Sequence, residues 1–346
     1  MTGTFDEHEF GPESGQQALN SIKGVPALKW GERRDCTFCG AVTVLCNTTG
    51  VDVTYEQVMG LSGACYRICM KEDWCPSAAM PQCAYDVETP LYRALGFQPY
   101  RIDDPEARRQ RIVECIDKGV PVLCGEQRVE MEWGLITGYV NQGEAFFGRS
   151  YFDFMGAKAE ETFTDDGYFL ADKLPGFDVV FLDRRGDPLP PKEALRQSLE
   201  VRVATLNASP LPEHGYVNGY EAYDLWIRVL ESGLTFNEFA GKNGFHIGAL
   251  RDARRCASVY LEQSLALVEG ENRVRLGKAA SLLETMFDRV VAFAPLSYAN
   301  NENCWQLSDG DWDMPRRREQ AQLLREMRAM EREAEAEFRA VLGDWS

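Results

Sequence analysis

The feature that most constrains the fold is a change of hydrophobic period at the proline-rich segment RRGDPLPPKEA, residues 184–194. Before it, short apolar runs such as 120–125 and 133–140 are bounded by glycine and polar residues, which is typical of buried strands. After it, apolar residues recur three and four positions apart to the end of the chain, which indicates helices. The sequence therefore predicts an α+β domain over residues 1–188 and an all-α helical domain over 189–346.

The charge of the chain excludes several classes of partner. The net charge is −17 and the pI is near 4.8, so the surface repels nucleic acid and anionic membranes. No stretch approaches 18 uninterrupted apolar residues, and the acidic start MTGTFDEHEFGPESG lacks the pattern of a signal peptide. We therefore expect a cytoplasmic protein, in which the eleven cysteines are thiols, metal ligands or catalytic groups.

Two cysteines, Cys36 and Cys39, open a predicted helix in RRDCTFCGAVTVL, with Asp35 as the expected N-cap. One interpretation is a redox pair, because a helix N-terminus favours a thiolate. A thioredoxin-like pair follows a buried strand, however, and the preceding GERRD is a poor strand. Two further interpretations are metal ligation and a single nucleophile.

A metal site would draw on the cysteine-rich loop at residues 62–86. Its thiols suit zinc or an iron–sulfur cluster by ligand type, and Cys36 or Cys39 could join them. Their intervals match neither a zinc ribbon nor a ferredoxin run, and buried free cysteines also act as small hydrophobes. We expect no cofactor, with zinc as the alternative. The four loop cysteines are Cys65, Cys69, Cys75 and Cys83.

The third interpretation makes Cys36 a nucleophile at the helix N-terminus. The helix end stabilises the thiolate, and the backbone amide of the same residue can stabilise an oxyanion when the sulfur attacks a carbonyl. Papain-like enzymes use this arrangement, with a His and an Asn or Asp supplied later by strands of the sheet.

The segment DCTFCGAVTVLCNTTGVDVTYEQVMGLSGACYRI, residues 35–68, resembles the BtrH-type family of butirosin biosynthesis. That family is in turn similar to the papain-like peptidases that process bacteriocin leaders. The shared pattern is a Cys opening a helix, a Gly fourteen residues later and a GLSG segment ending in Arg. Here these are Cys36, Gly50 and residues 60–67. WCPS, EWGLITGY and the helical tail also look similar. The resemblance implies a papain-like α+β fold and acyl-transfer or amide chemistry through Cys36, with Cys39 as a packing residue.

The chain departs from this resemblance where the leader peptidases carry their histidine. Glu132 occupies that position, and no His lies between residues 9 and 213. A carboxylate beside a thiolate raises the thiol pKa by like-charge repulsion. Glu132 would therefore act as a general acid or base only if burial raises its own pKa. Otherwise it recognises a cationic substrate, such as an amine or aminoglycoside, or is a solvated residue where a strand begins.

Further candidates are more distant along the chain. Asp153 falls where the third papain-like residue is expected, or is a polar residue at a strand end. His246 and His214 could supply a base to Cys36 if the helical domain covers the cleft, or could be surface residues. Arg254 is either an ion-pair partner for the acidic domain or an ordinary charge on a helix surface, and we expect the latter. Trp133 is a candidate for substrate binding or a core residue, and the other candidate substrate-binding residues are Trp74 and Arg67.

Two hypotheses follow from these residues. In the first, the chain is a cysteine-dependent acyltransferase or amidohydrolase acting on a small molecule, with an amine acceptor or a carrier-protein-bound acyl donor as options. In the second, it is a non-hydrolytic protein of the same fold that binds a ligand or a thiophilic metal through Cys36 and the cysteine-rich loop. The charged C-terminal helix has a narrow apolar stripe that could form a homodimer.

Overall fold

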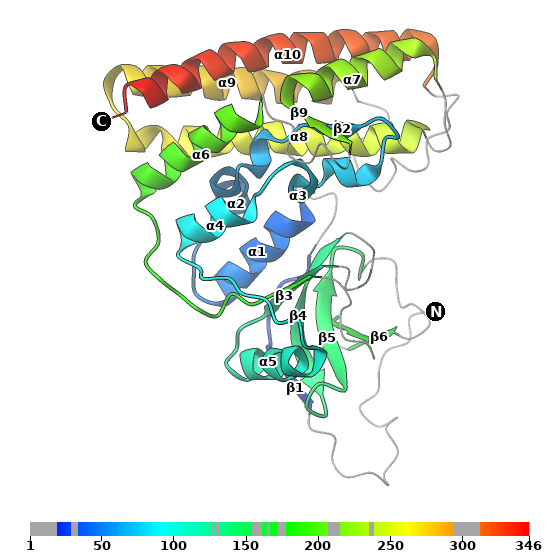
Figure 1. The fold of residues 1–346 in the computed structure, drawn as a ribbon, viewed down its shortest axis with the longest axis vertical. Helices are drawn as coiled ribbons and strands as arrows, with labels where there is room; N and C mark the ends of the chain where they lie inside the picture. Colours follow the sequence, from blue (N-terminus) through cyan, green and yellow to red (C-terminus); the bar gives the residue numbers. More distant parts are fainter. Residues whose placement is uncertain are drawn as a thin grey trace. The chain divides into compact units, whose positions relative to one another are not determined.

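The structure is a computed structural model that describes residues 19–28, 34–125, 128, 132–153, 161–164, 167–171, 178–206, 215–234, 239–293 and 312–345 (Figure 1). Its fold is mixed α+β, as the sequence predicts. The chain divides into two compact units. We call Met1–Thr54 with Gly96–Asp187 the sheet unit, and Tyr55–Leu95 with Pro188–Ser346 the helical unit.

The described strands of the sheet unit form one antiparallel sheet in the order β6-β7-β5-β4-β3-β8, with β1 paired to β4. They are β1 (Leu19–Ser21), β3 (Val122–Gly125), β4 (Trp133–Val140), β5 (Ala145–Ser150), β6 (Glu161–Phe163), β7 (Phe169–Ala171) and β8 (Val179–Val180).

Helices cover both faces of the central strand β4. Trp133 contacts Phe38 of α1 (Thr37–Thr48), with ring centroids 5.2 Å apart. Ile136 points to the opposite face, where it joins the core formed with α5 (Pro105–Asp117). Because both faces are covered, every residue of WGLITGYV is buried and the strand shows no alternation of apolar and polar residues.

In its described residues, the helical unit contains five long helices and the segment Tyr55–Leu95. The long helices are α6 (Pro191–Thr205), α7 (Gly219–Ser232), α8 (Phe239–Ser264), α9 (Gly270–Phe293) and α10 (Met314–Gly343). The preceding segment forms α2 (Tyr55–Ser62), η1 (Ala64–Tyr66), β2 (Cys69–Lys71), η2 (Pro76–Ala79), α3 (Pro81–Ala84) and α4 (Glu88–Leu95), and β2 pairs with β9 (Tyr216–Asn218). Among the described residues, no helix is both long and apolar enough to cross a membrane.

Residues 55–95 differ in placement from the sequence prediction, which assigned them to the first domain. The structure groups them with the helical unit, because α2 packs against α8 and α6. A Cβ added to Gly60 would lie 2.1 Å from the ring of Tyr260, and Ser198 Oγ donates a hydrogen bond to the Gly60 carbonyl at 2.7 Å. The GLSG segment therefore has a packing role, since only glycine allows this close approach.

The C-terminal helix α10 buries its apolar stripe within its own unit. Leu324, Met327 and Phe338 are fully buried, and α10 lies alongside α9 and α7 (Figure 1). The surface that suggested a homodimer is thus used inside the chain.

Candidate active site in the sheet unit

Cys36 is the residue from which helix α1 begins. Its backbone is extended (φ −88°, ψ 102°), and its carbonyl accepts the first helical hydrogen bond from Gly40 N–H at 2.9 Å. Cys36 is therefore the N-cap, and the prediction of Asp35 as the cap is wrong by one residue. Both cysteines are buried. They differ in position, because Cys36 lies at the end of the helix and Cys39 lies one turn further along it.

The first residues of β4 are hydrogen-bonded to the first residue of α1. Trp133 N–H donates to Thr37 Oγ1 at 3.3 Å, and the Thr37 hydroxyl hydrogen-bonds the Glu132 carboxyl. Burial raises the pKa of Glu132 from 4.5 to about 7, although the Thr37 hydrogen bond acts in the opposite direction. Thr37 directly follows Cys36, so the Glu132 carboxyl is hydrogen-bonded to the residue next to the candidate nucleophile.

Tyr151 is a member of this site that the sequence reasoning missed. A Cβ added to Gly40 would lie 1.5 Å from Tyr151 Oη and 2.7 Å from Cζ, so the phenol rests against the helix one turn from Cys36. The pairing of Gly134 with Ser150 brings Tyr151 to the sheet end where β4 begins. A glycine inside an otherwise apolar helix was the available signal, because such a glycine often marks close packing.

Asp153 has contacts that account for it as a structural residue. Its carboxylate accepts hydrogen bonds from Ser150 N–H at 3.2 Å and from Arg128 Nη1 at 3.3 Å. Burial raises the pKa of Asp153 to about 6, opposed by Ser150 N–H, Arg128 and Arg149. The buried Arg128 guanidinium lies over the rings of Phe163 and Phe169. Among the described residues, Arg128 and Ser150 are thus the hydrogen-bond partners of Asp153, and Cys36 is not one of them.

Three other predicted site residues come together in the helical unit. Arg67 and His246 line the same small pocket, and Trp74 lies edge-on to His246 with ring centroids 6.1 Å apart. Burial lowers the pKa of His246 to about 4, with a smaller effect from Lys242. His246 is thus a neutral imidazole within the helical unit, while Cys36 belongs to the sheet unit. His214 lies outside the described residues.

The cysteine-rich loop does not assemble the four-thiolate set that the metal hypothesis needs. The Cys65 thiol lies near Arg254, Arg202 and Arg67, and burial raises its pKa to about 12. Cys69, Cys75 and Cys83 instead gather near Tyr216, whose hydroxyl hydrogen-bonds Cys83. Within the described ranges, no group of three or more His, Cys, Asp or Glu side chains is arranged to hold a metal ion.

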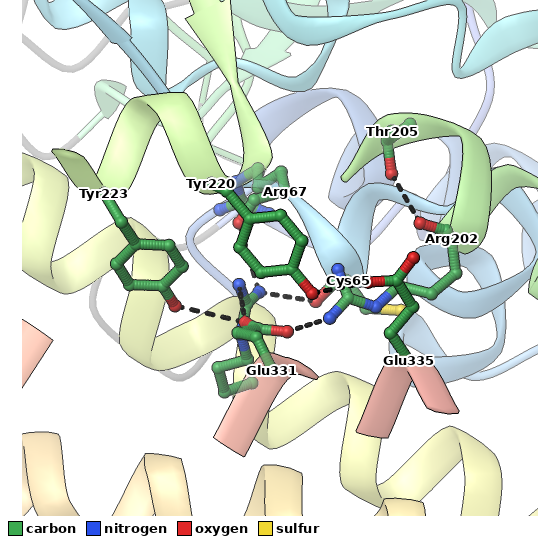
Figure 2. Close-up of polar contacts among 9 residues, drawn as sticks. Cys65, Arg67, Arg202, Thr205, Tyr220, Tyr223, Glu331 and Glu335 are labelled. Atoms are coloured by element: carbon green, nitrogen blue, oxygen red, sulfur yellow. Dashed lines mark hydrogen bonds and ion pairs between the residues drawn. The ribbon is translucent and has the colours of Figure 1, made fainter. Parts of the chain in front are cut away.

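Arg254 was expected on a helix surface, and this expectation is wrong. It is fully buried, and with Arg202 it pairs with the buried Glu331, which also accepts a hydrogen bond from Tyr223 Oη at 3.1 Å (Figure 2). Arg254 Nη1 donates to the carbonyls of Cys65 at 3.3 Å and Arg67 at 3.1 Å. The network joins α6, α8 and α10 to the segment around η1.

No protein-family model matches this chain, and no curated protein is significantly similar to it.

Proposed function

We propose that the sheet unit is a papain-like, cysteine-dependent enzyme that transfers an acyl group or cleaves an amide. Cys36 is the nucleophile and Glu132 is the general acid and base in place of histidine. The observation that carries this proposal is the hydrogen-bonded connection from Trp133 through Thr37 to Glu132. It holds a carboxyl with a pKa of about 7 next to the residue that follows Cys36.

The raised pKa answers the electrostatic objection to a carboxylate base. An ordinary thiol has a pKa of about 8.5, so transferring its proton to a carboxylate with a pKa of about 4.3 costs about 6 kcal/mol. Transfer to Glu132, with its pKa of about 7, costs about 2 kcal/mol. The product is a thiolate beside a neutral carboxylic acid, so no like-charge pair forms.

The reaction then follows the usual course of covalent acyl transfer. Glu132 takes the Cys36 thiol proton while the sulfur attacks the acyl carbon, and the first-turn amides of α1 stabilise the oxyanion. The neutral Glu132 returns the proton to the leaving group, which leaves an acyl thioester on Cys36. As an incoming amine or water attacks the thioester, Glu132 accepts its proton. Glu132 then passes this proton to the Cys36 sulfur, which leaves as the thiol.

The acceptor in this proposal is a small amine, with an acyl donor that is free or bound to a carrier protein. An amine is cationic before it loses its proton, and the net charge of −17 favours the approach of a cation. Glu132 as a carboxylate would bind the ammonium ion, which loses one proton to solvent before Glu132 accepts the second proton during the attack. Water in place of the amine gives hydrolysis through the same thioester.

The proposal is tested by trapping the acyl enzyme. The full chain is incubated with an acetyl thioester of N-acetylcysteamine, and intact-mass spectrometry follows acetylation with and without propylamine. The wild type and Cys39→Ser should gain one acetyl group, which propylamine removes, while Cys36→Ser should gain none. Equal acetylation of Cys36→Ser would exclude Cys36 as the nucleophile, and absence of acetylation in the wild type would count against the reaction class.

A further inference from the structure

We propose that Tyr151 is a catalytic residue of the sheet unit, whose hydroxyl donates a hydrogen bond to the oxyanion formed when Cys36 attacks an acyl group. This role rests on the function proposed above, and it adds a side-chain donor to the backbone amides of α1. The position of the phenol oxygen at Gly40 of that helix carries the proposal.

The phenol of Tyr151 approaches α1 with its hydroxyl end first. Measured from the place of a Cβ on Gly40, Oη lies at 1.5 Å, Cζ at 2.7 Å and Cε2 at 3.3 Å. The oxygen thus occupies the space that a side chain at position 40 would fill. Tyr151 is 2% exposed, and a donor held in such buried surroundings stabilises a negative charge more strongly than water does.

Position 40 lies on the face of α1 that also carries Cys36. Gly40 follows Cys36 by four residues, and its N–H donates to the Cys36 carbonyl at 2.9 Å. Side chains at this spacing share a helix face, with Cβ atoms about 5–6 Å apart, and they tilt towards the helix N-terminus. The Tyr151 hydroxyl, which takes the place of the missing Cβ, is therefore roughly 4–7 Å from the Cβ of Cys36. At that separation it can reach the oxygen of an acyl group bonded to the sulfur.

The sheet holds the phenol in this position. The antiparallel pairing of β4 with β5 brings together the first residue of β4, Trp133, and the residue that follows β5, Tyr151. Trp133 contacts Phe38 of α1, with ring centroids 5.2 Å apart, and Tyr151 contacts Gly40 of the same helix. Both rings therefore face α1, so the hydroxyl is in place before the substrate binds, as an oxyanion donor must be.

The hydroxyl acts on the tetrahedral intermediate. The Cys36 sulfur forms a bond to the acyl carbon, the C=O π bond breaks, and its electron pair becomes a negative charge on the oxygen. Tyr151 Oη–H donates a hydrogen bond to that oxygen and keeps its own proton. The C=O bond forms again as the leaving group departs with the proton from Glu132.

Tyr151→Phe removes only the phenol oxygen, and its effect is measured on two reactions of the same sulfur. Acetylation by the acetyl thioester of N-acetylcysteamine passes through an oxyanion, whereas alkylation by iodoacetamide does not. Peptide mass spectrometry of the full chain follows both rates at Cys36. Acetylation of Tyr151→Phe should be about 100- to 1,000-fold slower than that of the wild type, while alkylation should stay within about twofold.

The matched control is Tyr168→Phe, which removes another phenol hydroxyl of the sheet unit at 2% exposure. This hydroxyl accepts a hydrogen bond from Val25 N–H at 3.0 Å and donates one to the Ile22 carbonyl at 3.1 Å. Its loss should leave both rates at Cys36 unchanged, which separates the proposed role of Tyr151 from the general effect of losing a buried hydroxyl.

Three results would overturn the inference. Acetylation of Tyr151→Phe at the wild-type rate would refute the role of Tyr151 and leave the function proposed for Cys36 standing. Equal losses of acetylation and alkylation would show that Tyr151 supports the thiol or the fold and not the oxyanion. Absence of acetylation in the wild type would refute both proposals together.

Gly40→Ala serves if Tyr151→Phe does not fold, because its methyl group takes the place of the hydroxyl. It should show the same selective loss of acetylation. Wild-type rates of both reactions in this variant would also count against Tyr151.

Discussion

Replacing Glu132 by glutamine should make the protein more stable at alkaline pH while abolishing acylation. The folded-state pKa of about 7 lies above the ordinary value of 4.5, so the folded protein binds this proton more tightly than the unfolded chain. The contribution of Glu132 to stability is therefore complete below pH 4.5 and is lost as the pH rises through 7. Glutamine does not titrate, and its carbonyl can still accept the Thr37 hydrogen bond.

The size of the effect follows from the two pKa values. The difference between the two values corresponds to about 3 kcal/mol when the pH passes from below the lower value to above the higher one. Most of this change falls between pH 5 and pH 8.5. Urea unfolding at several pH values should thus show Glu132→Gln gaining about 2–3 kcal/mol on the wild type across this range.

The control for this experiment is Glu106→Gln, which removes a carboxylate of the same unit whose side chain is 85% exposed. Its stability relative to the wild type should change far less over the same pH range. A constant difference between Glu132→Gln and the wild type from pH 5 to 8.5 would refute the assignment of a raised pKa. The low free-energy cost of proton transfer from Cys36 to Glu132, on which the proposed mechanism depends, would then be refuted as well.

Three further changes test the site and the buried ion pairs. Thr37→Val removes the hydroxyl that lowers the pKa of Glu132, so the acid limb of the pH profile of kcat/KM should move above pH 7. The control Thr37→Ser keeps a hydroxyl and should leave the acid limb in place. An acid limb that does not move in Thr37→Val would contradict the hydrogen bond. Glu331→Gln leaves two buried guanidiniums without a carboxylate and should cost about 3–5 kcal/mol in urea unfolding. Glu335→Gln, one turn along α10, should cost less, and equal losses would argue against the network. Gly40→Ala pushes a methyl group into a neighbouring phenol, so it should cost about 1–3 kcal/mol and slow acylation; wild-type behaviour would show that the ring moves aside.

Structural features that depend on a few neighbouring residues were predictable from the sequence. Helix α5 begins at Pro105, and the Asp104 side chain accepts a hydrogen bond from Ala107 N–H at 2.8 Å, as expected for an N-cap followed by proline. The five long helices after residue 188 also follow the spacing of their apolar residues. Caps and periodicity act over a few residues, so a single sequence contains them.

Features that depend on distant contacts were not predictable. Residues 55–95 join the helical unit through contacts such as that of Gly60 with Tyr260, two hundred positions later. β2 was missed because its three residues pair with another three-residue strand far along the chain. The burial of Arg254 depends on Glu331 in the last helix, and a charged helical residue alone predicts a surface position. In the same way, Tyr151 reaches the site only because β5 pairs with β4.

Stability and reactivity are linked through the same carboxyl group. Burial disfavours the charged form of Glu132, and this cost lowers the stability of the folded unit at neutral and higher pH. The free energy lost in this way equals the increase in the proton affinity of Glu132. This increase is what would let the carboxyl take a proton from a thiol. A better-solvated Glu132 would stabilise the fold and would be a poor base. Under the proposed mechanism, a carboxylate replaces histidine only where the remaining contacts, such as the Thr37 hydrogen bond and the Trp133–Phe38 packing, keep it in place.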